Sequence, residues 1–176
     1  MDVESKRKEV LFTRDKIQKR VEEMGRQIRS DYEDKKIMTI SLLKGSFVFT
    51  ADLVREIDLP IRVEFMITSS YGHATVNSGK VKIVQDIEAD LSDYDVLVVD
   101  DIADSGVTLD FIMKHLAGKN PKSLASCVLL DKPSRRTTDI EADYVGFTIP
   151  DKFIVGYGLN YGHHYRNVPY IFAFVD

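Results

Sequence analysis

The densest group of side chains able to do chemistry lies between residues 98 and 109, in the segment VVDDIADSGVTL. An apolar run there ends at two adjacent carboxylates, Asp100 and Asp101, which could hold sugar hydroxyls or a hard cation such as Mg²⁺. The turn that follows is small and polar, and its glycine allows a ligand to approach the backbone closely. Its residues are Asp104, Ser105, Gly106, Val107 and Thr108. We therefore expect a phosphate-binding turn beside a pair of carboxylates.

The elements on either side of this turn explain why it could bind a ligand. Residues 95–101 form the clearest buried strand of the sequence, and residues 107–118 have the apolar spacing of a helix. In open α/β sheets, ligands bind beyond the carboxyl ends of strands, where a helix N-terminus presents backbone N–H groups. The alternative is that Asp104 and Ser105 only cap the helix and that the two preceding aspartates are solvated. Three acids and two hydroxyls so close together favour the ligand site.

Strands and helices alternate along most of the chain. Apolar runs predict strands at 37–43, 61–68, 80–84, 95–101 and 123–130. Helical spacing predicts helices at 13–30, 46–57 and 107–118, with Thr13 and Ser46 as N-caps. This order predicts an α/β fold with a mainly parallel, twisted sheet flanked by helices, in a single domain of residues 1–176. From Asp131 onward the chain is richer in glycine and aromatic residues, so we expect a small lobe of loops and short strands there.

Composition excludes several classes of protein. The chain has 176 residues, of which 44% are hydrophobic and 30% charged, as in one soluble domain of ordinary size. Its net charge of -4 argues against a general nucleic-acid binder. The only cysteine, Cys127, lies in the apolar run LASCVLL, so we expect it to be buried and inert in a reducing compartment. Because no signal peptide or membrane-spanning run is visible, we expect a cytoplasmic protein with no membrane or nucleic-acid partner.

The segment VLVVDDIADSGVT resembles the phosphoribosyl pyrophosphate (PRPP) binding motif of the type I phosphoribosyltransferases. That motif is an apolar run, two acids, two apolar or small residues, an Asp or other residue, Ser or Thr, Gly, any residue and Thr. The resemblance implies that family's α/β fold, with a small hood formed mainly by about residues 131–176 together with the N-terminal segment. It also implies that Asp100 and Asp101 contact the ribose and Mg²⁺. The turn from Asp104 to Thr108 would hold the 5′-phosphate, and Asp104 would accept a proton near the purine N7.

Two further segments resemble the hypoxanthine-guanine branch of that family. SLLKGS is similar to its Leu-Lys-Gly loop, whose peptide bond can be cis, and this implies that Lys44 and Gly45 contact pyrophosphate. SSYG is similar to the start of its mobile catalytic loop, which implies that Ser70 and Tyr71 close over the reaction centre. Without the resemblance, Lys44 would be interpreted as a solvated lysine at a strand end, and the second segment as a flexible polar loop.

The last third of the chain resembles the base-binding part of the same branch. LLDKPSRR places Lys132 where the family uses a lysine against the purine 6-oxo group. The resemblance implies that this cationic donor favours oxo-purines over 6-amino purines. In GFTIPDKFIVGYGLNYGHHYRNVPY the match implies that Phe153 stacks on the purine, Ile154 offers backbone contacts to its edge and Arg166 reaches pyrophosphate. Taken alone, Lys132 would be interpreted as a surface lysine and Phe153 as ordinary core packing.

Two positions depart from the family pattern. Asp100 stands where the family usually has glutamate, and either carboxylate can accept from ribose hydroxyls. Asn160 stands where the family commonly has an aspartate associated with a second Mg²⁺ and the edge of the base. An amide oxygen binds a cation more weakly than a carboxylate does. Whether a second Mg²⁺ binds, and how the exocyclic amine of guanine is recognised, are therefore left open. His163 and His164 follow, but no further ligand is spaced around them as a transition-metal site requires.

The resemblance implies a purine salvage enzyme. Its reaction would transfer the phosphoribosyl group of PRPP to N9 of hypoxanthine or guanine, giving IMP or GMP and pyrophosphate. The family associates, so a homodimer or homotetramer is expected. One alternative is a nucleotide-responsive regulatory protein with the same fold and no transferase activity. Another is a receiver-type signalling domain, which also has adjacent acids at a strand end but would leave the DSGVT turn and the C-terminal segment without a role.

Overall fold

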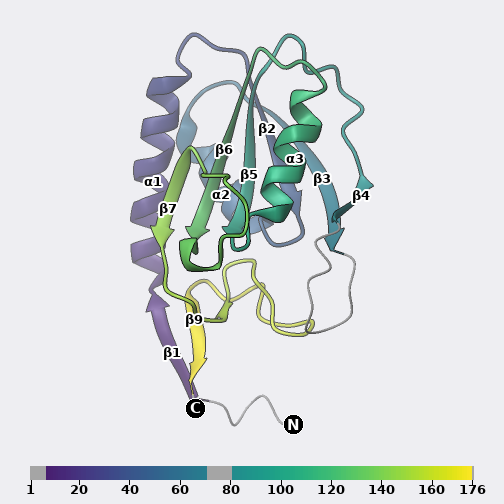
Figure 1. Ribbon diagram of the computed structural model, residues 1–176. Helices are drawn as coiled ribbons and strands as arrows, with labels where there is room; N and C mark the ends of the chain where they lie inside the picture. Colours follow the sequence, from purple (N-terminus) through teal and green to yellow (C-terminus); the bar gives the residue numbers. More distant parts are fainter. Residues whose placement is uncertain (1–6, 71–80, 176) are drawn as a thin grey trace.

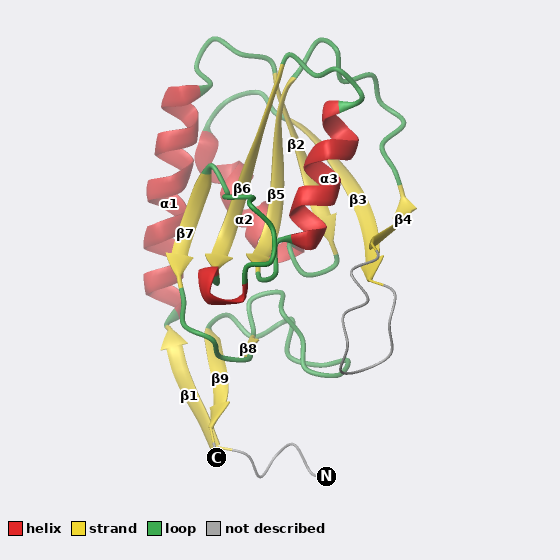
Figure 2. Cartoon of the chain, viewed as in Figure 1, coloured by secondary structure: helices red, strands yellow, loops and turns green. Residues whose placement is uncertain are grey.

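A six-stranded sheet and a smaller three-stranded sheet organise the described residues, which are 7–70 and 81–175 of the computed structural model (Figures 1 and 2). The large sheet contains β2 (Ile37–Leu43), β3 (Arg62–Ser70), β4 (Val81–Gln85), β5 (Asp95–Ala103), β6 (Ser123–Asp131) and β7 (Tyr144–Thr148). The helices are α1 (Arg14–Asp31), α2 (Phe47–Ile57) and α3 (Val107–Ala117). The small sheet contains β1 (Arg7–Phe12), β8 (Ile154–Val155) and β9 (Ile171–Val175).

The strand order of the large sheet is β4-β3-β2-β5-β6-β7, and its neighbours are parallel except for the pair β3–β4. From β2 the chain passes through α2 to β3 on one side, whereas from β5 it passes through α3 to β6 on the other side. The direction of winding therefore reverses between β2 and β5. At such a point the loops after the two strands diverge and leave a crevice for a ligand. The expected α/β fold with a mainly parallel sheet is confirmed.

The helices cover both faces of the large sheet because each carries an apolar stripe. Helices α1 and α2 pack against one face and α3 packs against the other. The predicted stripe of α1 is buried, and the Thr13 hydroxyl accepts a hydrogen bond from the Lys16 N–H at 3.3 Å, so the predicted N-cap is confirmed. Between these layers Cys127 is free and fully buried, and burial raises the pKa of its thiol. Within the described residues no helix is long and apolar enough to cross a membrane.

Ser46 occupies the N-cap position of α2, as predicted, but its side chain makes no capping hydrogen bond. Its hydroxyl lies 2.6 Å from the carbonyl oxygen of Leu42, to which it donates, and 2.8 Å from the Ser41 hydroxyl. Both serines are buried. The side chain is thus used to tie the end of β2 to the start of α2, and it stabilises the turn that holds Lys44 and Gly45.

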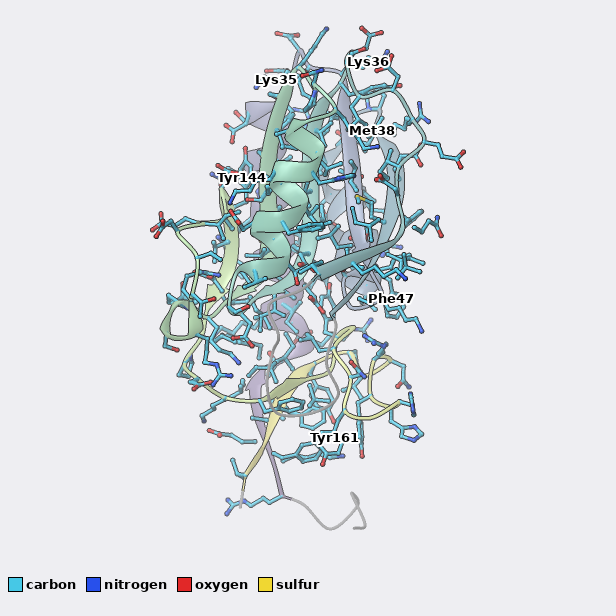
Figure 3. The ribbon with its side chains drawn as sticks, turned by 45° about the vertical axis from the view of Figure 1, so that its right-hand side comes forward. Lys35, Lys36, Met38, Phe47, Tyr144 and Tyr161 are labelled. Atoms are coloured by element: carbon cyan, nitrogen blue, oxygen red, sulfur yellow. The ribbon has the colours of Figure 1, made fainter. Side chains whose placement is uncertain are left out.

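The last third of the chain divides between the two sheets. Strand β7 pairs in parallel with β6 and so belongs to the large sheet, although it lies in the part of the chain where only a small lobe was expected. In the small sheet, β1 and β8 both pair antiparallel with β9. We call β1 and residues 149–175 the hood. The hood lies at the carboxyl ends of the parallel strands: its Tyr161 is at the opposite end of the molecule from Lys35 and Lys36, which precede β2 (Figure 3).

Candidate active site

The turn between β5 and α3 presents backbone donors at its open side. Gly106, just before α3, has a φ of 82°, a left-handed conformation that glycine adopts without strain. Among the described residues, no backbone–backbone hydrogen bond of a turn or loop has the N–H of Asp104, Ser105 or Gly106 as its donor. The Ser105 hydroxyl accepts from the Val107 N–H at 3.4 Å. Unpaired N–H groups at a helix N-terminus attract anions, so this turn can receive a phosphate.

The carbonyl side of the same turn is held by residues 132–138. Donors of this segment bond to the carbonyl oxygens of Ala103, Asp104 and Ser105 at 2.9, 3.3 and 2.9 Å. A Cβ atom on Gly106 would lie 2.4 Å from a side-chain oxygen of the same segment, so there is no room for a larger residue. The turn is therefore held in place through its carbonyl groups, and these bonds use none of its N–H groups.

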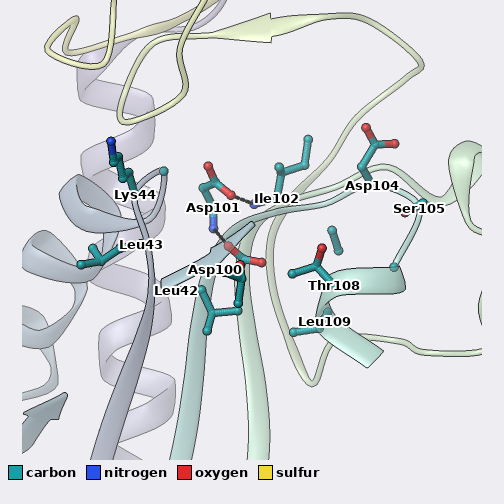
Figure 4. Close-up of a pocket in the computed structure, with 14 residues that line it drawn as sticks. Leu42, Leu43, Lys44, Asp100, Asp101, Ile102, Asp104, Ser105, Thr108 and Leu109 are labelled. Carbon is teal, nitrogen blue, oxygen red and sulfur yellow. Dashed lines mark hydrogen bonds between the residues drawn. The ribbon is translucent and has the colours of Figure 1, made fainter. Parts of the chain in front are cut away.

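Two adjacent carboxylates end the apolar part of β5. Asp100 accepts from the Asp101 N–H at 2.9 Å, and Asp101 accepts from the Ile102 N–H at 2.8 Å (Figure 4). Burial raises the pKa of Asp100 well above its ordinary value, and the neighbouring charge of Asp101 adds to the effect. Burial also raises the pKa of Asp101, against the opposing influence of Arg166. This pair, in which Asp100 is buried and Asp101 is half-buried, costs stability in the free protein and would gain from a cationic ligand.

Asp100→Asn is expected to stabilise the protein at neutral pH in the presence of EDTA. Because the folded-state pKa of Asp100 lies above the unfolded value, its contribution to stability falls as the pH rises from about 4 toward neutrality. Asparagine keeps an acceptor for the Asp101 N–H but carries no charge. We expect the unfolding temperature to rise by about 2–4 °C for each kcal/mol of burial cost removed. Calorimetry from pH 4 to pH 8 should show the difference growing with pH, and equal unfolding temperatures throughout would contradict it.

The turn after β2 lies against the second of these acids. The peptide bond between Leu43 and Lys44 is cis. A Cβ atom on Gly45 would lie 1.8 Å from Oδ2 of Asp101, so the backbone of this turn is in direct contact with the carboxylate. In Figure 4 the side chains of Lys44, Asp101 and Asp104 point toward the same side of the sheet edge. The glycine is required by this close approach.

These two turns enclose a hollow of about 280 Å³, which we call the β2–β5 hollow. It is lined by Leu42, Leu43, Lys44, Gly45, Thr68, Asp100, Asp101, Ile102, Ala103, Asp104, Ser105, Gly106, Thr108 and Leu109. The hollow lies at the point where the strand order reverses, as expected for a ligand site in an open α/β sheet. Its floor is acidic and its two sides offer an ammonium group and free backbone donors.

The hood contacts the hollow through a second glycine. Gly158 has a φ of 100°, and a Cβ atom there would lie 2.2 Å from the carbonyl oxygen of Gly45. The Arg166 guanidinium donates to the carbonyl oxygen of Gly158 at 2.6 Å. Burial raises the pKa of Asp101, and the positive charge of Arg166 makes this rise smaller. Arg166 is therefore held beside the turn that carries Lys44.

Lys132 lies at the opposite end of the hollow, beside Asp104. Its side chain is only 7% exposed, and its Nζ atom lies 3.6 Å from Oδ2 of Asp104. A buried ammonium requires a counter-ion, and this carboxylate supplies one. The arrangement brings a cationic donor and a half-exposed carboxylate to one point above the strand end.

The aromatic residues of the hood form a connected group. Phe153 packs edge-to-face on Tyr161 with ring centroids 5.8 Å apart, and Tyr161 packs on Phe174 at 5.0 Å. The Phe153 side chain nevertheless remains 63% exposed, so most of its ring is free for a planar ligand. Ile154 follows it in β8 and is buried, and the Asn160 side-chain amide donates to the carbonyl oxygen of Gly162 at 2.5 Å.

Comparison with known proteins assigns the family. The family model described as "Phosphoribosyl transferase domain" matches residues 10–162 of the chain. The chain belongs to this phosphoribosyltransferase family. The resemblance seen in the sequence is therefore confirmed.

Relatives of this phosphoribosyltransferase carry consistent names. The hypoxanthine-guanine phosphoribosyltransferase of Bacillus subtilis (strain 168) is 46% identical over 92% of this chain and 90% of its own length. The hypoxanthine phosphoribosyltransferase of Salmonella typhimurium is 47% identical, with 93% of each chain covered. A crystal structure of a hypoxanthine phosphoribosyltransferase from Staphylococcus aureus superposes with a TM-score of 0.91 at 44% identity, covering 95% of this chain and 91% of that one.

The structure brings most of the predicted site residues of this phosphoribosyltransferase to one sheet edge. Seven of the predicted residues line the hollow together with Asp104: Lys44, Gly45, Asp100, Asp101, Ser105, Gly106 and Thr108. Lys132 reaches it through its ion pair with Asp104. Arg166 lines a separate cavity and is connected to the hollow through Gly158, which lies against Gly45. Phe153, Ile154 and Asn160 lie in the hood and are not among the lining residues. Ser70 ends β3, and Tyr71 lies outside the described residues.

Sequence reasoning missed several residues that the structure places at this site. Arg135 and Asp151 each form ion pairs with the predicted residues, and Gly158 contacts the Gly45 turn. Thr68 lines the hollow from β3. The run of cations after Lys132 and the aspartate of IPDK were visible signals, but neither belongs to a pattern with a single chemical meaning.

Proposed function

We propose that the chain transfers the phosphoribosyl group of PRPP to N9 of hypoxanthine or guanine, giving IMP or GMP and pyrophosphate. The observation that carries this proposal is the β2–β5 hollow, where a phosphate-binding turn, a carboxylate pair and the Lys44–Gly45 turn face one another. The relatives named above are 6-oxopurine phosphoribosyltransferases that this chain matches over nearly their full length. They do not support the regulatory alternative.

In the proposed reaction, N9 of the purine forms a bond to C1′ of the ribose as the bond from C1′ to pyrophosphate breaks. The proton of the base passes from N7 to Asp104. Charge develops on the sugar and on the leaving group, so the contribution of the protein is to hold both substrates and to place opposite charges near them. The turn from Asp104 to Thr108 receives the 5′-phosphate through its free N–H groups. Lys44 and Arg166 provide cations for the pyrophosphate.

Mg²⁺ is the cofactor that this site fits. Asp100 and Asp101 are adjacent carboxylates, and oxygen ligands of this kind suit a hard divalent cation. Within the described residues there is no group of three or more side chains able to hold a metal. Oxygens of PRPP and water would therefore complete the coordination. When bound, the cation would neutralise charge on the pyrophosphate group.

The purine would lie between the hood and the sheet edge. The exposed ring of Phe153 offers a stacking surface, and the Ile154 backbone lies beside it. Lys132 is the donor available for the 6-oxo group, because its buried ammonium is directed to the end of the hollow beside Asp104. The Asn160 side chain is engaged with the Gly162 carbonyl, so its contribution to a second metal would require that bond to open.

Lys132→Met is expected to raise the KM for hypoxanthine by about tenfold or more and to leave the KM for PRPP within about twofold. Methionine keeps most of the apolar stem but cannot donate to a 6-oxo group. Steady-state kinetics with each substrate varied in turn would measure this. A larger effect on PRPP than on hypoxanthine would discredit the assignment of Lys132 to the base.

We also infer that the protein is a cytoplasmic homodimer or homotetramer. This inference rests on the resemblance to a family that associates, and the rings of Phe47 in α2 and Phe65 in β3 are exposed and would be available to a second copy of the chain. Sedimentation of the purified protein would measure the assembly directly. A monomer at micromolar concentration would contradict the expected association.

The function itself is tested by nucleotide formation. Purified protein with PRPP and Mg²⁺ would be offered hypoxanthine, guanine, xanthine and adenine in separate reactions. We expect rapid product with hypoxanthine or guanine and little with adenine. Saturable binding of PRPP without product from any base would contradict the transferase activity and favour a regulatory role.

A further inference from the structure

Four charged side chains form a closed group at the end of the β2–β5 hollow. We call Asp104, Lys132, Arg135 and Asp151 the four-charge cluster. The Lys132 ammonium lies 3.6 Å from Asp104 and 3.9 Å from Asp151. The Arg135 guanidinium lies 3.7 Å from Asp104 and 3.6 Å from Asp151. Each cation therefore contacts both carboxylates, although Asp151 comes from the hood and Asp104 from the β5–α3 turn.

Burial makes Lys132 the member that depends most on its partners. Its side chain is 7% exposed, whereas Asp104 and Asp151 are 45% and 54% exposed. Both of its ion pairs are longer than a hydrogen bond, so the ammonium is held by charge while its N–H groups remain available to another acceptor. Oδ1 of Asp104 is likewise buried without a hydrogen-bond partner among the described residues. The Lys132 ammonium is therefore the group of this cluster whose hydrogen-bonding capacity is left unused by its ion pairs.

The proposed function engages Asp104 with the purine, and this would weaken its hold on Lys132. A purine proton received by Asp104 would neutralise that carboxylate. Asp151 then remains as a counter-ion that the ligand does not use. The Arg135 guanidinium forms an ion pair with the Asp151 carboxylate at 3.6 Å. This ion pair holds Asp151 in place on the solvent-exposed side of the cluster.

We infer that Asp151 is a positioning residue that holds the Lys132 ammonium toward the 6-oxo group while Asp104 interacts with the purine. The inference rests on the proposed function. Asp151 would act through Lys132 and would touch neither PRPP nor the base. It therefore contributes to recognition of the purine and not to use of PRPP.

Kinetics of Asp151→Asn provide the first test. We expect the KM for hypoxanthine to rise by about five- to tenfold, with kcat and the KM for PRPP within about twofold of the wild type. Asp151→Glu keeps the carboxylate, so its KM for hypoxanthine should be close to that of the wild type. Glu141→Gln removes another exposed carboxylate outside the cluster and should leave all three parameters unchanged. Equal effects of Asp151→Asn on both substrates would overturn the inference.

A double-mutant cycle separates positioning from a structural role. In a Lys132→Met background, adding Asp151→Asn should cause no further change in the KM for hypoxanthine, because the group it positions has been removed. Additive effects of the two changes would overturn the inference. Circular dichroism and unfolding temperatures would verify that each variant is folded, and Asp151→Ser, which also removes the carboxylate, supplies the same comparison if Asp151→Asn does not fold.

A readout that needs no turnover distinguishes failure of this inference from failure of the proposed function. In ligand-free protein labelled with ¹⁵N-lysine, the Lys132 ammonium signal would be assigned by its loss in Lys132→Met. We expect that signal to be retained in Glu141→Gln and to be shifted or lost in Asp151→Asn. An unchanged signal in Asp151→Asn would overturn the inference even if the wild type is an active transferase. A wild type that forms no nucleotide would overturn the proposed function and leave this measurement valid.

Discussion

Replacing Asp104 by asparagine is expected to lower kcat by about 10²–10⁴-fold, the usual contribution of a positioned proton acceptor. The change keeps the size of the side chain and removes its ability to take a proton. It also removes a counter-ion from Lys132, which lies 3.6 Å away and is buried. Single-turnover measurements with hypoxanthine at saturating PRPP would report the chemical step directly.

The same change should leave binding of PRPP within about threefold of the wild type. The proposed phosphate-binding turn is held through its backbone carbonyls, which accept hydrogen bonds from residues 132–138 and do not depend on the Asp104 carboxylate. Asp110→Asn is the matched control, because Asp110 lies on α3 in an exposed ion pair with Lys114 at 2.7 Å. It should alter kcat by less than about twofold. Turnover near the wild-type rate in Asp104→Asn would remove Asp104 from the chemistry.

Gly45→Ala is expected to lower kcat/KM for PRPP by about 100-fold, because a displacement near 1 Å at a positioned group has effects of that size. The new methyl group would overlap Oδ2 of Asp101, at 1.8 Å in the present geometry. Asp101 cannot simply turn aside without losing its bond from the Ile102 N–H. The opposite side of the turn is closed as well, because the Gly45 carbonyl lies against Gly158.

Gly118→Ala is the control for a glycine substitution. Gly118 has a φ of -64°, an ordinary helical value, and the nearest atom to an added Cβ is 3.3 Å away. This variant should retain the wild-type kcat/KM for PRPP, because Gly118 follows the end of α3 that is remote from the β5–α3 turn. Steady-state kinetics with PRPP varied, together with unfolding temperatures, would compare the two variants. Wild-type kcat/KM for PRPP in Gly45→Ala would show that the close contact between Gly45 and Asp101 is not needed for function.

The sequence alone predicted the features that depend on near neighbours in the chain. The apolar stripe of α1, the buried run of β5 and the small polar turn before α3 are local patterns, and each appears where it was expected. Ser46 shows the limit of such patterns, because a serine before a helix usually caps it, whereas here its hydroxyl turns back to the Leu42 carbonyl in a buried site. The place of β7 in the large sheet was also missed, because its five residues are only partly buried and form no distinctive apolar run.

Only the tertiary structure decided which of these local features meet. The order β3-β2-β5-β6 places the Gly45 turn against Asp101, more than fifty residues away in the sequence, with no room for a Cβ atom. It also brings together the four-charge cluster, whose members Arg135 and Asp151 belong to no sequence pattern with a single chemical meaning. The physical reason is that periodicity and turn chemistry act over a few residues, whereas contacts between distant turns depend on how the strands are ordered in the sheet. The residue types that can do chemistry were therefore visible in the sequence, and their mutual distances were set by the fold.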